Sequence, residues 1–99
     1  MQPAITVTAD YTLTPSDYTV FCNNTGGATK HVTLPAAAGN LGKVYVIKRI
    51  CGVTNNCDVI GLTATEGNPF GLGVPGGSAN SSIIVQSDGS SWWIMSNTK

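Results

Sequence analysis

A tight turn near the C-terminus is the feature that most constrains how this chain folds. The turn, Asp88-Gly89, separates two runs of β-prone residues at 82–87 and 91–96, and this dipeptide between apolar runs is typical of a two-residue hairpin. Strands joined in this way pair antiparallel and belong to a sheet. The sequence therefore predicts β structure at this end of the chain.

The second arm of the hairpin is apolar on both of its faces. Successive side chains of a strand point to opposite sides, so Trp92 and Ile94 share one face while Trp93 and Met95 share the other. A surface strand in a small monomer alternates apolar and polar residues. This strand therefore needs cover on both sides, and the sequence does not decide which face belongs to the core and which to an interface.

Residues 43–50 repeat this pattern in the middle of the chain. Val44 and Val46 share one face of the predicted strand, and Tyr45 and Ile47 share the other. Burial of apolar surface stabilises a protein by about 25 cal/mol per Å2. A subunit interface or a covering loop over the second face would therefore add to stability.

Short β-prone runs, separated by clusters of Gly, Asn, Asp and Pro, make up the rest of the chain. We expect an all-β fold with no substantial helix: a single compact antiparallel β-sandwich or small barrel of about 7–8 short strands. The predicted strands cover residues 4–8, 11–13, 18–22, 31–34, 43–50, 57–64, 82–87 and 91–96.

The length of the chain, 99 residues, suits one domain that spans all of it. We expect a disordered start at residues 1–3 and a long loop rich in Gly, Ser and Asn at residues 67–82. This loop carries Phe70, Leu72 and Val74 at a spacing of two. Three apolar side chains in one loop favour packing against a surface, either of the same chain or of a neighbouring subunit.

Charge is scarce in this chain. Charged residues make up 10% of it and the formal net charge is zero, whereas the average protein has about 25%. The few basic residues are scattered, which argues against nucleic acid as a partner. Residues 1–4 lack the pattern of a signal peptide, and no apolar run is long enough for a membrane span. We therefore expect a protein that is not inserted in a membrane and is made in a cytoplasm, with a leader that was removed as the alternative. Its weak self-repulsion suits a part of an assembly.

Three cysteines are present. Cys51 and Cys57 bracket a turn-like segment, and in a hairpin they would lie close enough for a disulfide; two reduced thiols are the alternative in a cytoplasm. Cys22 lies in an apolar run and is expected to be a small buried residue. The thiols and the single histidine, His31, lack the paired spacing of zinc ligands, so we expect no metal site and no cofactor.

Two longer blocks of the sequence resemble a known kind of domain. Residues 32–48 (VTLPAAAGNLGKVYVIK) and residues 85–94 (VQSDGSSWWI) stand in that order, after the shorter run 18–21 (YTVF). Together they resemble a small β domain common in tailed-phage fibre and appendage proteins. The resemblance covers most of the chain, residues 11–96.

This resemblance implies a virion structural domain that is trimeric and lies near the tip of a fibre. Such domains hold three chains in register, and some touch the host surface. The chain departs from the usual pattern after Ile50, where Cys51 and Cys57 stand in place of a short polar turn. The departure leaves the implied trimer intact and makes a local cross-link an open question.

Catalytic residues are hard to assemble from this chain. His31 is the single ordinary general base, and we expect it on the solvated face of a strand; three copies meeting on a threefold axis would be an alternative site for a metal or an anion. The acids form no motif typical of a catalytic pair. They are Asp10, Asp17, Asp58, Glu66 and Asp88. We therefore expect no enzymatic activity and no catalytic residue.

The predicted function is structural. We expect a non-enzymatic domain of a phage fibre or related virion appendage, made in the host cytoplasm and located in the virion. It would form a homotrimer, contact other virion proteins and take part in host attachment. The predicted subunit interface comprises Val44, Tyr45, Val46, Ile47, Phe70, Leu72, Val74, Trp92, Trp93, Ile94 and Met95.

A monomeric carbohydrate-binding module is the alternative, because exposed aromatic rings stack on sugar rings. The aromatic residues for this role are Trp92, Trp93, Tyr11, Tyr18 and Tyr45. Candidate contacts with a host cell-surface glycan are the polar residues of two loop tips. They are Asn23, Asn24 and Thr25 at one tip and Asn80 and Ser81 at the other.

Overall fold

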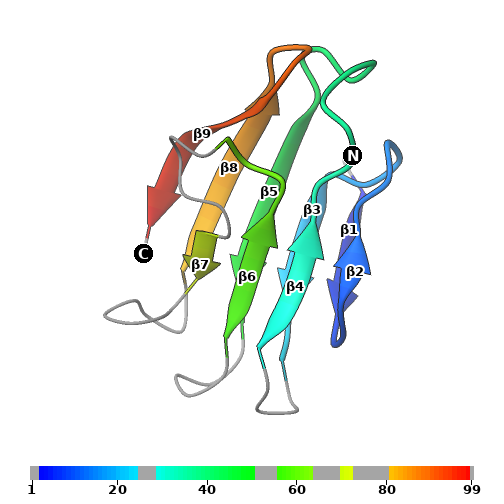
Figure 1. The fold of residues 1–99 in the computed structure, drawn as a ribbon. Coiled ribbons are helices and arrows are strands. Elements are labelled where there is room, and N and C mark those ends of the chain that lie inside the picture. The colour runs from blue at the N-terminus through cyan, green and yellow to red at the C-terminus, as the bar shows by residue number, and fades with distance from the viewer. Residues whose placement is uncertain (1–2, 25–28, 51–55, 64–69, 73–80, 99) are drawn as a thin grey trace.

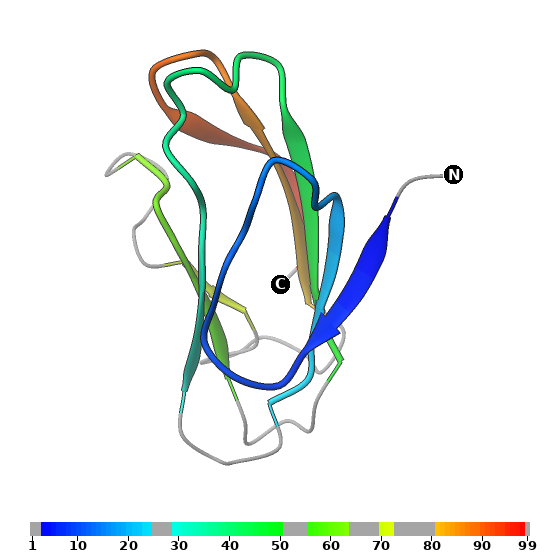
Figure 2. The same ribbon diagram turned by 90° about the vertical axis from the view of Figure 1, so that its right-hand side faces the viewer.

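The computed structural model describes residues 3–24, 29–50, 56–63, 70–72 and 81–98 of the chain. Nine strands lie in this part of the chain and form two sheets that face each other across a hydrophobic core (Figure 1, Figure 2). The described residues include no helix, and so none long and apolar enough to cross a membrane. The predicted all-β sandwich is confirmed, and the two sheets do not close into a barrel.

The larger sheet contains five strands in the order β1-β3-β5-β8-β9. They are β1 (Ala4–Val7), β3 (Thr19–Cys22), β5 (Val44–Arg49), β8 (Ser82–Ser87) and β9 (Trp92–Thr98). The smaller sheet contains four strands in the order β2-β4-β6-β7. They are β2 (Tyr11–Thr12), β4 (Lys30–Thr33), β6 (Cys57–Ile60) and β7 (Phe70–Leu72).

The first six strands follow a coil that alternates between the two sheets. β1, β3 and β5 pair in parallel in the larger sheet, and β2, β4 and β6 do so in the smaller one. In the larger sheet Thr19 of β3 pairs with Val46 of β5, and in the smaller sheet Lys30 of β4 pairs with Cys57 of β6. In both cases the paired residues are 27 positions apart in the sequence. Each of the strands β2 to β5 thus lies within a crossover connection of the other sheet, and this supplies the length that parallel pairing needs.

This parallel pairing corrects the predicted all-antiparallel arrangement. Side chains alternate in the same way in parallel and antiparallel strands, so the pattern of one strand does not reveal its neighbour. Among the described strands, antiparallel pairing is confined to β5–β8, β8–β9 and β6–β7. The nine strands outnumber the predicted 7–8, because β7 lies within residues 67–82, which were predicted to be a loop.

Pro3 is the first residue that the structure describes, and it contacts β3. The carbonyl oxygen of Pro3 accepts a hydrogen bond from the backbone N–H of Thr19 at 3.1 Å. The disordered start at residues 1–3 stays a prediction. Residues 1–2 lie outside the described part of the chain.

The predicted hairpin at Asp88-Gly89 is confirmed. β8 and β9 pair antiparallel on either side of it, and Gly89 has a φ of 93°, in the region that favours glycine. Asp88 fixes the turn, because its Oδ1 atom accepts hydrogen bonds from the backbone N–H groups of Ser90 and Ser91, each at 2.8 Å. The side chain of Asp88 thus provides an acceptor for two backbone N–H groups of the turn, and this stabilises the turn.

The core lies between the inner faces of the two sheets. Burial alternates residue by residue along β5 and β8, so each strand turns every second side chain inward. The indole of Trp92 and the phenol ring of Tyr45 pack together there, with ring centroids 5.3 Å apart. The buried apolar residues are Leu13, Val20, Cys22, Val32, Leu34, Ala37, Tyr45, Ile47, Cys57, Val59, Leu62, Leu72, Ile83, Val85 and Trp92.

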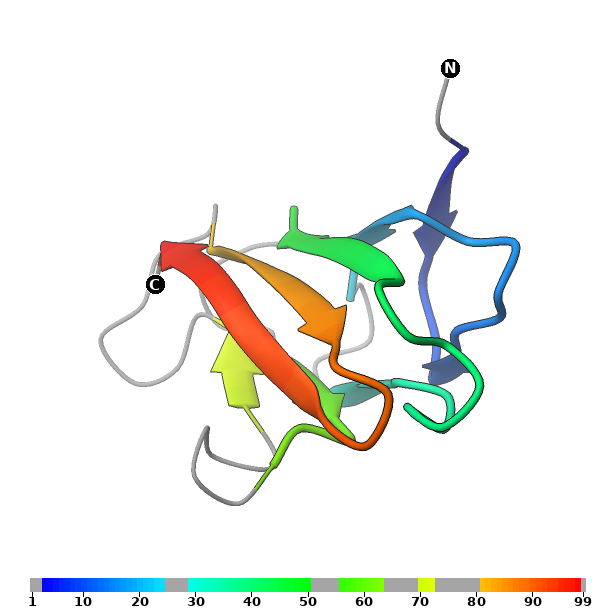
Figure 3. The ribbon, with the colours of Figure 1, turned by 90° about the horizontal axis from the view of Figure 1, so that it is seen from above.

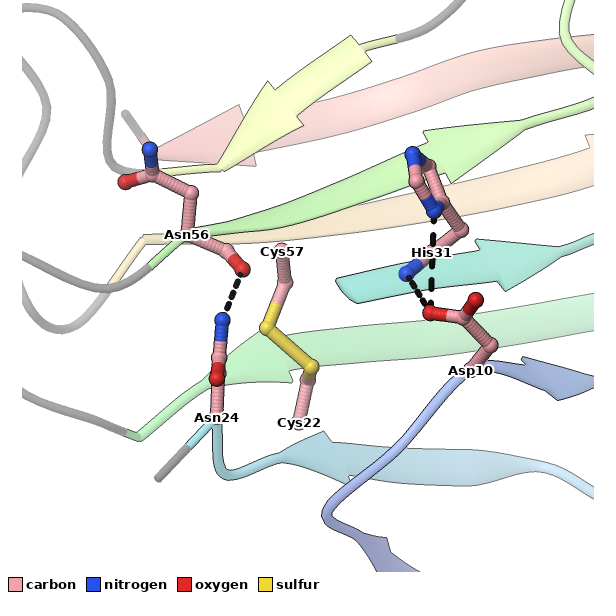
Figure 4. The surroundings of a disulfide bond; sticks show 6 residues. All are labelled: Asp10, Cys22, Asn24, His31, Asn56 and Cys57. Atoms are coloured by element: carbon pink, nitrogen blue, oxygen red, sulfur yellow. Dashed lines mark hydrogen bonds and ion pairs between the residues drawn. A yellow bond between two sulfur atoms is a disulfide. The ribbon is translucent and has the colours of Figure 1, made fainter. Parts of the chain in front are cut away.

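A disulfide joins the two sheets through this core. Cys22, the last residue of β3, bonds to Cys57, the first residue of β6, with their Cα atoms 6.5 Å apart (Figure 4). The predicted disulfide between Cys51 and Cys57 is therefore wrong, because the side chain of Cys57 points into the core and bonds to Cys22 there. Cys22 is buried as predicted, and Cys51 itself lies outside the described residues.

Candidate functional site: the outer face of the five-stranded sheet

Four of the predicted interface residues belong to the core instead. Tyr45, Ile47, Leu72 and Trp92 are at most 2% exposed. The sequence showed that β5 and β9 have two apolar faces, and the structure shows that these residues are on the inner one. The prediction was wrong for all four, because a side chain that packs between the sheets has no surface left for a second subunit.

Ile94 also lies on the inner side of the sheet. It is half-buried and packs against the core residues, so it is not part of an exposed surface. The side chain of Phe70 and the whole of Val74 lie outside the described part of the chain. Their predicted place in an interface stays a prediction.

The remaining predicted residues gather on the outer face of the larger sheet. Val44 and Val46 lie on β5, Trp93 and Met95 lie on β9, and Ile84 of β8 lies between these strands. Val46 pairs with Ile84 across the sheet. Trp93 is 37% exposed and Met95 is 60% exposed, while the other three are half-buried. We call these five residues the outer apolar face.

A bulge sets the position of Met95. Val85 pairs with Ile94 and Ile84 pairs with Ser96, so Met95 is the extra residue of β9 at this point. A bulge leaves its extra residue unpaired and increases the local twist of the strand. Met95 therefore stands clear of the regular pairing, and its flexible thioether side chain suits an adaptable apolar contact.

Trp93 is held in place by the turn that precedes it. Its indole N–H donates a hydrogen bond to Oδ2 of Asp88 at 2.8 Å. The backbone N–H groups of Ser90 and Ser91, together with this indole N–H, keep the pKa of Asp88 below its usual value, so the acceptor is ionised near neutral pH. The polar atom of the indole is thus satisfied within the chain, and the ring offers apolar surface to a partner.

Ile84 is a member of this face that the sequence analysis did not include. A signal for it was present, because Ile83, Ile84 and Val85 are three consecutive apolar residues in a strand. Such a run has apolar side chains on both faces, as in β5 and β9. Ile83 and Val85 are fully buried, which leaves Ile84 on the outside.

Two of the predicted glycan contacts lie in the interior. Asn24 and Ser81 are both fully buried, and Nδ2 of Asn24 donates a hydrogen bond to the carbonyl oxygen of Asn56 at 2.8 Å (Figure 4). These two residues are corrected from surface contacts to interior polar groups, since the ends of β3 and β8 carry them inward. Asn23 is half-buried, and Thr25 and Asn80 lie outside the described residues.

The aromatic rings proposed for sugar stacking are mostly engaged elsewhere. The hydroxyl group of Tyr45 donates to the carbonyl oxygen of Thr14 at 2.7 Å, and burial raises the pKa of Tyr45. The hydroxyl group of Tyr11 donates to Oδ2 of Asp17 at 2.8 Å, and this hydrogen bond raises the pKa of Tyr11. Among the aromatic side chains that the structure describes, Trp93 is the exposed one.

His31 contacts a single carboxylate at the surface. Oδ1 of Asp10 accepts a hydrogen bond from the backbone N–H of His31 at 2.9 Å and lies 3.6 Å from its Nδ1 atom (Figure 4). The backbone N–H is the main reason that the pKa of Asp10 is lowered. An exposed pair of this kind contributes little to stability. Within the described residues, no three His, Cys, Asp or Glu side chains come together in a way that would hold a metal ion.

Comparison of the chain with protein-family models, with curated proteins and with solved structures finds no match.

Proposed function

We propose that this chain is a non-enzymatic structural domain of a phage fibre or a related virion appendage, and that three copies associate through the outer apolar face. The observation that carries the proposal is the outer apolar face itself, five apolar side chains on three neighbouring strands. The resemblance of residues 32–48 and 85–94 to fibre domains supports the virion context and the threefold state.

The chemistry of this face favours association with a second protein surface. Trp93 and Met95 are exposed apolar side chains beside each other on one edge strand, and tryptophan is among the residues that contribute most to binding in protein interfaces. The flexible side chain of Met95 adapts to the surface that it contacts. The ring of Trp93 stacks without needing a polar group from the partner, because its N–H is already bonded to Asp88. Three such faces turned toward a common axis would cover one another in a closed ring.

A monomeric carbohydrate-binding module receives less support. Its predicted aromatic contacts include Tyr45 and Trp92, which are buried, and its predicted loop contacts include Asn24 and Ser81, which are buried as well. On the outer face of the sheet, the exposed ring on which a sugar could stack is Trp93, the same ring that the outer apolar face supplies to a partner subunit.

The oligomeric state tests the proposal. Sedimentation velocity at micromolar concentration is expected to show a trimer for the unchanged protein. The double substitution Trp93→Ser and Met95→Ser is expected to give a monomer with unchanged circular dichroism, because both side chains point away from the core. The single substitution Met95→Lys is a milder version that leaves the hydrogen bond of Trp93 to Asp88 in place.

Leu41→Ser is the matched control for these variants. Leu41 is 77% exposed and lies in the connection between β4 and β5, next to Gly89 of the turn, and it is not one of the five residues of the outer apolar face. Its replacement removes a similar exposed apolar side chain and is expected to leave the trimer intact. A monomeric unchanged protein, or equal dissociation by the Leu41 and Met95 variants, would falsify the proposal.

A further inference from the structure

A hollow of about 320 Å3 lies at one end of the sandwich, apart from the outer apolar face. Three segments form it: residues 34–37 after β4, residues 61–63 after β6, and residues 90–92 at the start of β9. The turn between β8 and β9 and the connection between β4 and β5 meet at this end of the molecule (Figure 1, Figure 3). Trp92 and Trp93 separate the two surfaces, since the first lies on the inner side of the sheet and the second on the outer side.

The walls of the hollow combine apolar surface with hydroxyl groups. Pro35, which is half-buried, and Ala36, which is exposed, supply the accessible apolar surface. Leu34, Leu62 and the indole of Trp92 also line the hollow, and each is at most 5% exposed. Ser90 and Ser91 supply hydroxyl groups at the rim. None of the lining residues in the described part of the chain is charged.

The hydroxyl groups of Ser90 and Ser91 are available to a ligand. Their backbone N–H groups are occupied by Oδ1 of Asp88 at 2.8 Å, which fixes the turn. Among the contacts of the described residues, neither hydroxyl group makes a hydrogen bond. The ionised carboxylate of Asp88 lies next to these serines, so it would repel an anionic ligand.

Hydrogen bonds within the chain fix the positions of residues that line the hollow. The indole N–H of Trp92 donates to the carbonyl oxygen of Pro35 at 2.7 Å, and the backbone N–H of Leu34 donates to the carbonyl oxygen of Ile60 at 2.8 Å. At Gly61 an added Cβ atom would lie 3.0 Å from the Cβ atom of Leu34. A site built in advance loses less conformational entropy when it binds.

We infer that this hollow binds one neutral pyranose unit of a saccharide. A pyranose ring has an apolar C–H face and a rim of hydroxyl groups, which match the apolar wall and the two serines. The volume lies at the lower end of the range of ligand sites, about 300–1,000 Å3, and suits one ring rather than a long oligosaccharide. Phosphorylated or carboxylated ligands would find no cationic partner there.

An NMR titration of the full chain tests the inference. The probes are methyl glucoside, methyl galactoside, N-acetylglucosamine and N-acetylneuraminic acid. At least one of the three neutral sugars is expected to cause saturable shifts in the amide signals of Ser90 and Ser91 and in the indole N–H signal of Trp92, with an affinity of about millimolar order. The indole signal of Trp93 is the internal control and should stay in place, and the anionic sugar should bind more weakly than the best neutral one.

Two alanines of the connection between β4 and β5 provide matched variants. Ala36 and Ala38 are both exposed, and Ala36 lines the hollow whereas Ala38 does not. Ala36→Phe is expected to weaken binding at least tenfold, and Ala38→Phe should leave it unchanged. A double substitution, Ser90→Ala with Ser91→Ala, removes the hydroxyl groups without adding volume and is expected to weaken binding several-fold.

Absence of saturable shifts with every neutral sugar overturns the inference, and so does equal binding by the Ala36 and Ala38 variants. If Ala36→Phe does not fold, the double serine variant decides: unchanged binding counts against the hollow. The inference does not depend on the trimer. The Trp93→Ser, Met95→Ser variant should bind the sugar as the unchanged protein does, so the two proposals fail separately.

Discussion

At the scale of single residues, two glycines with positive φ differ in their surroundings. Gly61 has a φ of 114° and an added Cβ atom would lie 3.0 Å from that of Leu34, whereas Gly39 has a φ of 83° and nothing within 4 Å. Gly39→Ala is expected to destabilise by about 1–2 kcal/mol through backbone strain alone. Gly61→Ala should cost about 2–4 kcal/mol, because overpacking adds to the strain. Urea unfolding measures both, and equal losses would show that the contact with Leu34 does not matter.

Asp88 gives a prediction about pH at the same scale. Its carboxylate accepts hydrogen bonds from three N–H groups, and its pKa in the folded protein lies below the ordinary value of 3.8. The resulting stabilisation is present above the pKa of the unfolded chain and is lost as the pH falls through the folded-state pKa. Asp88→Asn should therefore lower the urea midpoint near neutral pH. In acid well below pH 3.8, the variant and the unchanged protein should converge, and a difference that persists there contradicts this role.

At the scale of elements, the disulfide between β3 and β6 cross-links the two sheets through side chains. It closes a loop with a sequence separation of 35 residues, and constraint of the unfolded chain by such a loop stabilises by about 3–4 kcal/mol. Reduction, or the double substitution Cys22→Ala and Cys57→Ala, should lower the free energy of unfolding by about this amount. Denaturant unfolding with and without reductant measures the loss.

Cys51→Ala is the control for the disulfide. It removes a thiol and leaves Cys22 and Cys57 unchanged, so the variant should respond to reductant as the unchanged protein does. A variant at position 51 that no longer responds would show that Cys57 pairs with Cys51 in solution.

At the scale of the whole molecule, the proposed association depends on apolar surface rather than on charge. The outer apolar face contains no ionisable side chain, and charged residues make up only 10% of the chain. The association constant of the trimer is therefore expected to change little between low and high salt, because screening acts on charged pairs. Sedimentation equilibrium across a salt series measures it, and a trimer that dissociates steeply with salt would point to a different interface.

The sequence by itself determined the class of fold and the supply of apolar surface. The turn at Asp88-Gly89 is a local signal, because its geometry depends on residues next to one another. The two-faced runs at residues 43–50 and 91–96 are also local, since alternation along a strand follows from backbone geometry. These patterns predicted a β sandwich, and they predicted that some apolar side chains of the strands would remain outside the core.

Only the tertiary structure decided which of those side chains remain outside. Tyr45 and Trp92 pack between the sheets while Val46 and Trp93 do not, and either choice satisfies the same alternation. The parallel coil of β1 to β6 and the bond between Cys22 and Cys57 were hidden for a related reason. Strand neighbours and disulfide partners are set by contacts between distant parts of the chain, which packing selects and local pattern does not encode.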